Sequence, residues 1–99
     1  MNPANLQLEG LYAAVAALMV ALREKGTLSA QEIEGALRAA EDKISSDPAR
    51  PTKLSDANRD AISFPLRFLR LANKASSEGH DLSFSELATL VGQTKPDLR

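Results

Sequence analysis

The sequence predicts an all-α protein, a small four-helix domain, and three observations support this fold class. Apolar residues recur at spacings of three and four in four separate segments, as they do in amphipathic helices. Leu and Ala, two of the strongest helix formers, supply most of the apolar surface in a chain with no Trp, one Tyr and three Phe. Typical start and stop signals of helices bound the segments. A chain of 99 residues has room for one hydrophobic core, so we expect residues 1–99 to form a single domain.

The first helix is predicted at about residues 3–25, with Asn2 as its N-cap and Gly26 as its C-terminal stop. Its larger apolar residues form one stripe: Leu8, Leu11, Val15, Leu18 and Leu22. Its smaller apolar residues form a second face: Ala13, Ala16, Ala17 and Val20, with Tyr12 and Met19 between the two. Because this helix is apolar on nearly every side, we expect it to be buried on more than one side.

The second and fourth helices are predicted at about residues 30–45 and 84–91, and the same joint precedes both. In each joint a glycine ends the preceding helix, and a capping box with a hydrophobic staple opens the next. The residues that correspond are Gly26, Leu28, Ser29, Glu32 and Ile33 in the first joint and Gly79, Leu82, Ser83, Glu86 and Leu87 in the second. The matching joints predict two helical hairpins that stack by their apolar faces.

The third helix is predicted at about residues 56–77, with Ser55 as its N-cap. Pro48 stops the preceding helix, and the segment between them is predicted to be an ordered linker. Pro65 removes one backbone hydrogen bond, but the apolar pattern continues on both sides, so we expect the third helix to be kinked there rather than broken. Residues 93–99 are predicted to form a frayed tail.

The apolar run at residues 11–22 is shorter than the roughly 20 residues of a membrane-spanning helix. A signal peptide is not expected either, because no Lys or Arg occurs before Arg23. The chain has no cysteine, which excludes disulfides, thiolate catalysis and cysteine-based metal sites. We therefore interpret the run as a buried helix of a cytoplasmic protein and expect no membrane partner.

The sequence offers little for catalysis. Its single histidine, His80, has Asp81 and Ser83 as neighbours, which lie too close in sequence to converge on one reacting atom. Glu78, His80, Asp81 and Glu86 are potential metal ligands around one turn, but a solvated turn with Glu86 occupied as a helix cap explains them more simply. No glycine-rich phosphate loop is present. We therefore expect a protein that is not an enzyme, with no cofactor and no metal.

A basic stripe on the third helix is the alternative candidate site, for an anionic ligand. Its members are Arg59, Arg67, Arg70 and Lys74. Cations on one helix face can hold phosphates, but these four have no aromatic residues among them and the net charge of the chain is -1. Acidic residues predicted on the second helix, such as Glu34 and Glu41, could pair with the stripe instead. Binding of nucleic acid or a phosphate ligand is kept as the alternative function, not as the main expectation.

Residues 83–96 resemble the opening of a helix-turn-helix. In that family a helix capped by Ser or Thr and carrying Glu-Leu-Ala is followed by a glycine turn and a recognition helix. Ser83, the Glu-Leu-Ala at residues 86–88 and Gly92 follow this pattern. Pro96, three residues before Arg99, leaves no recognition helix to enter a major groove, so the chain is not assigned to the family.

The surplus apolar surface of the first predicted helix is the best clue to function. Either this helix is the central one, wrapped by the other three, or its surplus face meets a partner, most simply a second copy related by two-fold symmetry. The candidate partner-binding residues are Tyr12, Ala13, Ala16, Met19 and Val20. The sequence thus predicts a non-enzymatic helical protein-interaction module, and a homodimer formed through the first helix is one version of that prediction.

Overall fold

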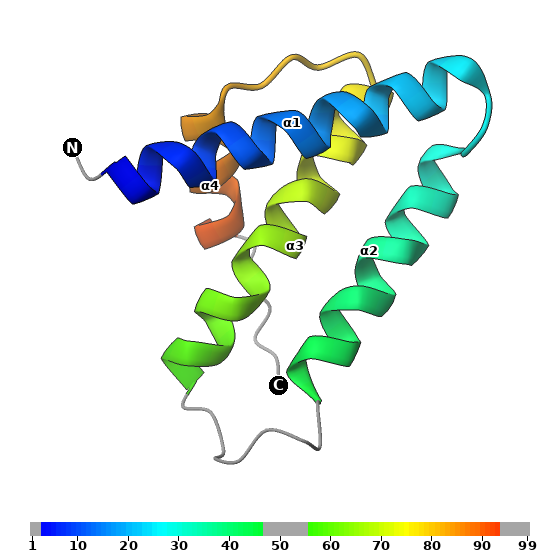
Figure 1. Ribbon diagram of the computed structural model, residues 1–99. Helices are drawn as coiled ribbons and strands as arrows, with labels where there is room; N and C mark the ends of the chain where they lie inside the picture. The colour runs from blue at the N-terminus through cyan, green and yellow to red at the C-terminus, as the bar shows by residue number, and fades with distance from the viewer. Residues whose placement is uncertain (1–2, 47–55, 94–99) are drawn as a thin grey trace.

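The described part of the chain, residues 3–46 and 56–93 of a computed structural model, consists of four α-helices and contains no strand (Figure 1). The helices are α1 (Pro3–Lys25), α2 (Ala30–Ser45), α3 (Asp56–Ser77) and α4 (Phe84–Gln93). The all-α fold is therefore confirmed. Helix α4 continues to Gln93, where the sequence predicted the start of a frayed tail. The predicted caps at Asn2 and Ser55, the linker and residues 94–99 lie outside the described residues.

Both glycine turns have the left-handed backbone that only glycine adopts without strain. The φ angle is 80° at Gly26 and 83° at Gly79. In each turn the amide of the residue after the glycine donates to a carbonyl five residues earlier: Thr27 to Leu22 at 3.0 Å and His80 to Ala75 at 2.8 Å. These bonds belong to the Schellman motif, which satisfies carbonyl groups at the end of a helix. The ends of α1 and α3 are therefore built in the same way.

Both predicted capping boxes are also present. The Ser29 hydroxyl accepts a hydrogen bond from the Glu32 amide at 3.0 Å, and the Glu32 carboxylate accepts one from the Ser29 amide at 2.8 Å. Ser83 and Glu86 make the same two bonds, at 3.1 and 2.8 Å. Reciprocal bonds of this kind satisfy amides in the first turn of a helix, and a cap contributes about 1 kcal/mol. They fix the residues at which α2 and α4 begin.

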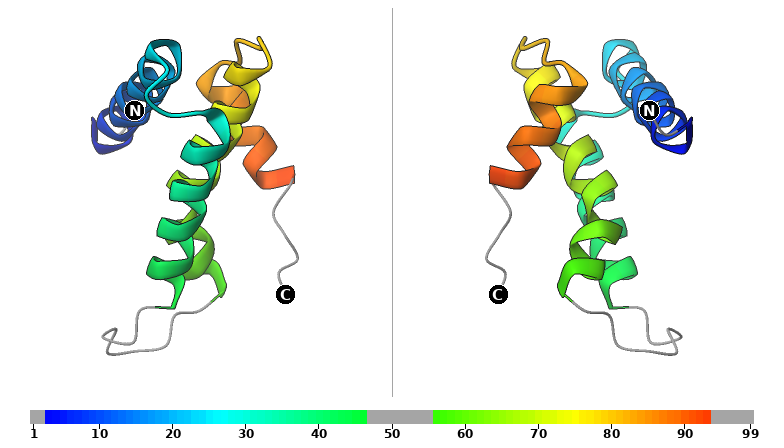
Figure 2. Two further views of the ribbon diagram at one scale, coloured as in Figure 1. Left: turned by 90° about the vertical axis from the view of Figure 1, so that its right-hand side faces the viewer. Right: turned by 90° about the vertical axis from the view of Figure 1, so that its left-hand side faces the viewer.

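The central helix is α3, which packs against each of the other three helices (Figures 1 and 2). Helix α2 runs antiparallel along α3, whereas α1 crosses the C-terminal half of α3 and diverges from α2 after their shared turn. The joints are as predicted, but the pair that packs side by side is α2 with α3, not α1 with α2. The alternative in which the first helix is central is wrong. Helix α3 runs through Pro65 without a break, and a kink there stays a prediction.

The hydrophobic core is small and centres on α3. Its buried apolar residues are Tyr12, Met19, Ile33, Phe68, Leu69, Ala72, Leu87 and Val91. The ring centroid of Phe68 lies 5.0 Å from that of Tyr12 and 4.9 Å from that of Phe84. These distances fall in the range of favourable aromatic pairs. Aromatic contacts therefore hold α1, α3 and α4 together.

Helix α1 turns a different side to the core than the sequence predicted. Tyr12 and Met19 are its buried residues. Leu8, Leu11 and Leu18, which belong to the predicted buried stripe, are 49%, 57% and 64% exposed. The prediction that this stripe is buried is therefore wrong for these three residues, whereas Val15 and Leu22 are half-buried. A helix that is apolar all round can face the core with any side, and contacts between the Tyr12 ring and phenylalanine rings of α3 and α4 favour the side observed.

By length and composition, α1 is also sufficient to cross a membrane. An 18-residue stretch of it has a mean hydropathy of 1.4, and 11% of that stretch is buried. Core helices of soluble proteins and signal sequences meet the same requirements, but core helices are mostly buried. The interpretation of residues 11–22 as a buried helix is therefore wrong for most of that run.

A buried polar cluster ties the end of α1 and the start of α2 to α3. Asn73, which is 2% exposed, donates from Nδ2 to the Ala30 carbonyl at 2.9 Å. Its Oδ1 accepts from Nη1 of Arg23 at 2.8 Å, and Nη2 of Arg23 donates to the Ser76 hydroxyl at 2.6 Å. Buried amides need such partners because an unsatisfied one is costly. The cluster therefore anchors the C-terminal end of α1.

Candidate functional site

An apolar groove of about 570 Å³ lies between α1 and a wall built by α3, α4 and the turn that joins them. We call it the α1 groove. Its α1 wall carries Tyr12, Ala13, Ala16, Ala17, Met19 and Val20. Its opposite wall includes Phe68, Ala72, Ala75, His80, Leu82 and Phe84. All five candidate partner-binding residues thus line one groove.

The five residues differ in how much of them a partner could reach. Tyr12 and Met19 are buried in the core of their own chain, so they cannot form an outer surface as the sequence prediction implied. Ala16 and Val20 are half-buried, and Ala13 is exposed. Burial raises the pKa of the Tyr12 phenol, which stays neutral at physiological pH. The accessible part of the α1 wall is therefore built from small and medium apolar side chains.

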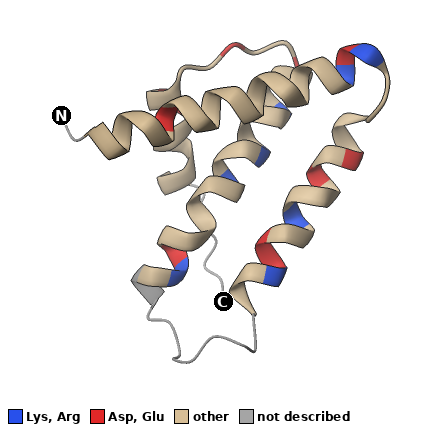
Figure 3. Ribbon diagram, in the orientation of Figure 1, with Lys and Arg blue, Asp and Glu red and all other residues tan. Residues whose placement is uncertain are grey.

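Two opposite charges lie at the ends of the α1 wall. Glu9 and Arg23 both line the groove, and α1 carries no charged residue between them (Figure 3). They are 14 positions apart, which corresponds to about 21 Å along a helix. Arg23 donates to Asn73 and Ser76, which are neutral, and within residues 3–46 and 56–93 neither Glu9 nor Arg23 has an ion-pair partner. The charges at the two ends are therefore not neutralised by the described chain.

No protein-family model, curated protein or solved structure matches this chain. The chemistry of the groove must therefore be interpreted from its own residues. Its length, its apolar walls and the placement of charge only at the rim are features of a surface that accepts an apolar segment.

The opposite wall of the groove is the part that sequence reasoning missed. The sequence pattern placed no residue of the third helix in this wall, and it assigned Leu82 only to the hydrophobic staple beside a capping box. The residues of this wall face α1 because α1 crosses α3 close to the turn between α3 and α4. This crossing depends on contacts between segments more than 40 residues apart, such as Arg23 with Asn73. The apolar pair Leu82 and Phe84 beside the turn was the one available signal.

The residues around His80 do not gather into a site. In the two described segments, no group of three or more His, Asp or Glu side chains is placed to hold a metal ion. Glu86 is occupied by the Ser83 amide, and Glu78 pairs with Lys74 at 3.1 Å. His80 and Asp81 are exposed on the rim of the α1 groove.

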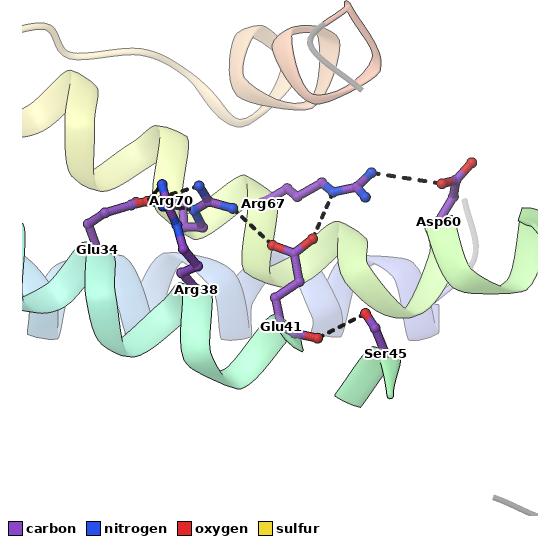
Figure 4. Close-up of polar contacts among 7 residues, drawn as sticks. All are labelled: Glu34, Arg38, Glu41, Ser45, Asp60, Arg67 and Arg70. Atoms are coloured by element: carbon purple, nitrogen blue, oxygen red, sulfur yellow. Dashed lines mark hydrogen bonds and ion pairs between the residues drawn. The ribbon is translucent and has the colours of Figure 1, made fainter. Parts of the chain in front are cut away.

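Two cations of the predicted basic stripe pair with α2 (Figure 4). Glu41 accepts from Nε of Arg67 and from Nη1 of Arg70, both at 3.0 Å. Nη2 of Arg70 lies 2.9 Å from Oε2 of Glu34, to which Arg38 also donates at 2.9 Å. The Glu41 and Arg67 side chains are only 12% and 15% exposed. Glu41 therefore bridges two arginines at the α2–α3 interface.

The rest of the stripe gives a phosphate ligand little to bind. Lys74 is paired with Glu78, just beyond the end of α3, and Arg59 is exposed. A cavity of about 610 Å³ beside Arg67 and Arg70 is lined by both signs of charge, including Glu34. A phosphate there would have to displace carboxylates that already hold the arginines. The structure thus favours the interpretation in which the stripe serves the α2–α3 interface.

The Glu34 carboxylate makes this interface sensitive to acid. Burial by itself raises its pKa, but the hydrogen bond and charge of Arg70, and then those of Arg38, outweigh that effect and hold the pKa below the ordinary value of 4.5. A carboxyl group whose pKa is lowered in the folded state stabilises the fold fully at pH values above its ordinary pKa. That stability is lost as the pH falls below 4.5 and through the folded-state pKa.

We therefore expect Glu34→Gln to lower the free energy of unfolding at pH 7 and to weaken its dependence on pH below 4.5. Urea unfolding at a series of pH values from neutral to acid measures both effects. Glu24→Gln, at an exposed position near the end of α1, is the control and should leave the acid limb unchanged. The same acid limb in wild type and Glu34→Gln would contradict the prediction.

Proposed function

We propose that the protein is a non-enzymatic, cytoplasmic interaction module that binds a protein partner in the α1 groove. The observation that carries this proposal is an open apolar groove beside a helix whose apolar residues are mostly exposed. Monomeric soluble proteins rarely expose contiguous apolar surface unless something binds there. The absence of cysteine is in keeping with a reducing compartment.

The shape of the groove favours an apolar helix as the bound segment. Peptide helices commonly dock by laying one apolar face into a groove, with anchors three, four and seven residues apart. Ala13, Ala16 and Ala17 let a helix backbone approach α1 closely, while Leu82 and Phe84 offer larger apolar contacts on the opposite wall. Each Å² of apolar surface removed from water contributes about 25 cal/mol. Covering the groove therefore provides the driving force for binding.

Binding of nucleic acid or a phosphate ligand has less support. Its candidate residues Arg67 and Arg70 are held by Glu41 and Glu34, and Lys74 is paired with Glu78. Among the residues that the structure describes, no aromatic side chain lines the cavity beside them. The α1 groove is therefore the better candidate site.

Site-specific photo-crosslinking in the source cell tests the proposed function. A photoreactive residue at Ala13, which is exposed in the groove, should give protein adducts of defined mass. The same residue at Ala39, exposed on α2, is the matched control and should not give these adducts. The proposal fails if Ala13 gives no adduct or the same set as Ala39. It also fails if the purified protein floats with phosphatidylcholine vesicles and Ala13 gives lipid adducts only.

A further inference from the structure

We propose that the α1 groove accepts α1 of a second copy of this chain, packed antiparallel about a two-fold axis at Ala16. This inference rests on the proposed function and names the partner that fills the groove. The arrangement is isologous, because each copy offers the same face to the other. It therefore closes as a dimer and does not propagate into a filament.

Charge complementarity selects this occupant and its direction. In an antiparallel pair centred on Ala16, Glu9 of each copy lies opposite Arg23 of the other, so the symmetric dimer has two such pairs. Within the described residues neither charge has an ion-pair partner in its own chain. A parallel pair would instead place Glu9 opposite Glu9 and Arg23 opposite Arg23. Opposed like charges are unfavourable, whereas complementary ones fix register.

The same register matches side-chain size along the contact. Ala16 of one copy lies on the axis against Ala16 of the other. On either side of the axis, position 13 of one copy lies opposite position 19 of the other, and position 12 lies opposite position 20. A small residue at the crossing lets the two helix axes approach to the 8–10 Å typical of packed helices. The half-buried side chain of Val20 in each copy then fills space on either side of the axis.

The wall of the groove opposite α1 contacts the bound helix of the second copy from its other side. Leu82 and Phe84 are half-buried apolar residues that line the groove across from α1. The turn between α3 and α4 adds Asp81 and His80 to the rim, and both are exposed to solvent. The charged groups Glu9, Arg23 and Asp81 therefore stay at the ends and rim of the groove, as does His80, and its walls are mostly apolar.

Charge-swap variants test the dimer and its direction. Wild type should show concentration-dependent association by sedimentation at micromolar concentrations. Glu9→Arg alone and Arg23→Glu alone should each weaken self-association by about tenfold or more, because each creates two like-charge pairs. An equimolar mixture of the two variants should recover the wild-type association, since both pairs are complementary in the heterodimer. A parallel dimer would leave the single variants unchanged, which would overturn the proposed direction.

A cysteine test covers the case in which Arg23→Glu does not fold, because Arg23 also bonds Asn73 and Ser76. The chain has no native cysteine, so a single introduced one reports one position. Ala16→Cys should form a disulfide-linked dimer under mild oxidation, because the two-fold axis places residue 16 against its counterpart. Ala21→Cys, exposed elsewhere on α1, is the control and should form no disulfide-linked dimer.

The outcomes separate this inference from the proposed function. A strictly monomeric wild type overturns the second copy as the occupant, whereas a dimer unaffected by Glu9→Arg overturns the antiparallel arrangement. If photo-crosslinking at Ala13 then gives adducts with a different protein, the proposed function stands without the dimer. If Ala13 gives no protein adduct and wild type stays monomeric, both fail.

Discussion

Replacing Phe68 with Ala should lower the free energy of unfolding by about 3–5 kcal/mol. Phe68 is 3% exposed, and its ring contacts those of Tyr12 and Phe84. Removing it opens a cavity where α1, α3 and α4 meet, and the neighbouring rings cannot fill that space without leaving their own contacts. Domains are typically stable by only about 5–15 kcal/mol. The substitution should therefore remove a large part of the total stability.

Urea unfolding followed by circular dichroism measures this loss. Leu18→Ala is the control, since it shortens an apolar side chain on α1 that is 64% exposed. Surface substitutions of this kind usually change stability by about 0.5 kcal/mol or less. If the two variants lost equal stability, the side of α1 that faces the core would have to be different from the one described.

Replacing Glu41 with Ala should lower the free energy of unfolding by about 2 kcal/mol. The carboxylate accepts from Arg67 and Arg70, and its loss leaves two guanidinium groups without their shared acceptor. Breaking a fully buried pair costs about 3–5 kcal/mol. The Arg70 side chain is 27% exposed, so water partly compensates and the expected cost is smaller.

The neighbouring substitution Asp42→Ala is a matched control for charge and helix position. Asp42 is exposed and makes no ion pair among the residues that the structure describes, so we expect a change within about 0.5 kcal/mol. Both variants are measured by urea unfolding at pH 7. Equal effects at the two positions would show that Glu41 acts through the net charge of α2 and not through its two arginines.

The local parts of this fold could be predicted from the sequence because their signals lie within a few residues. Ser29 and Glu32 satisfy each other's backbone amides three positions apart, and Gly26 takes a backbone angle that other residues avoid. Such contacts need no knowledge of the rest of the chain. Helix positions and joints therefore followed from pattern alone.

The packing could not be predicted in the same way, because it depends on contacts between distant segments. A helix with apolar residues all round gives no signal that Tyr12 and not Leu11 faces the core. Acidic residues on the second predicted helix were among the alternatives for pairing with the basic stripe, but the sequence could not choose between them and an anionic ligand. The groove could not be predicted because it forms only where α1 crosses α3.

The Asn73 cluster holds α1 at one end only. Arg23 is fastened to α3 there, whereas the buried residue of α1 nearest its other end is Tyr12. The contacts of the Tyr12 ring with Phe68 and Phe84 fix α1 a second time, so moving the whole helix would break the core. Residues 3–11 lie beyond these contacts, and all of them are exposed. The Glu9 end of the groove is therefore bordered by the part of α1 that its own chain holds least, and a ligand can enter there without displacing a core residue.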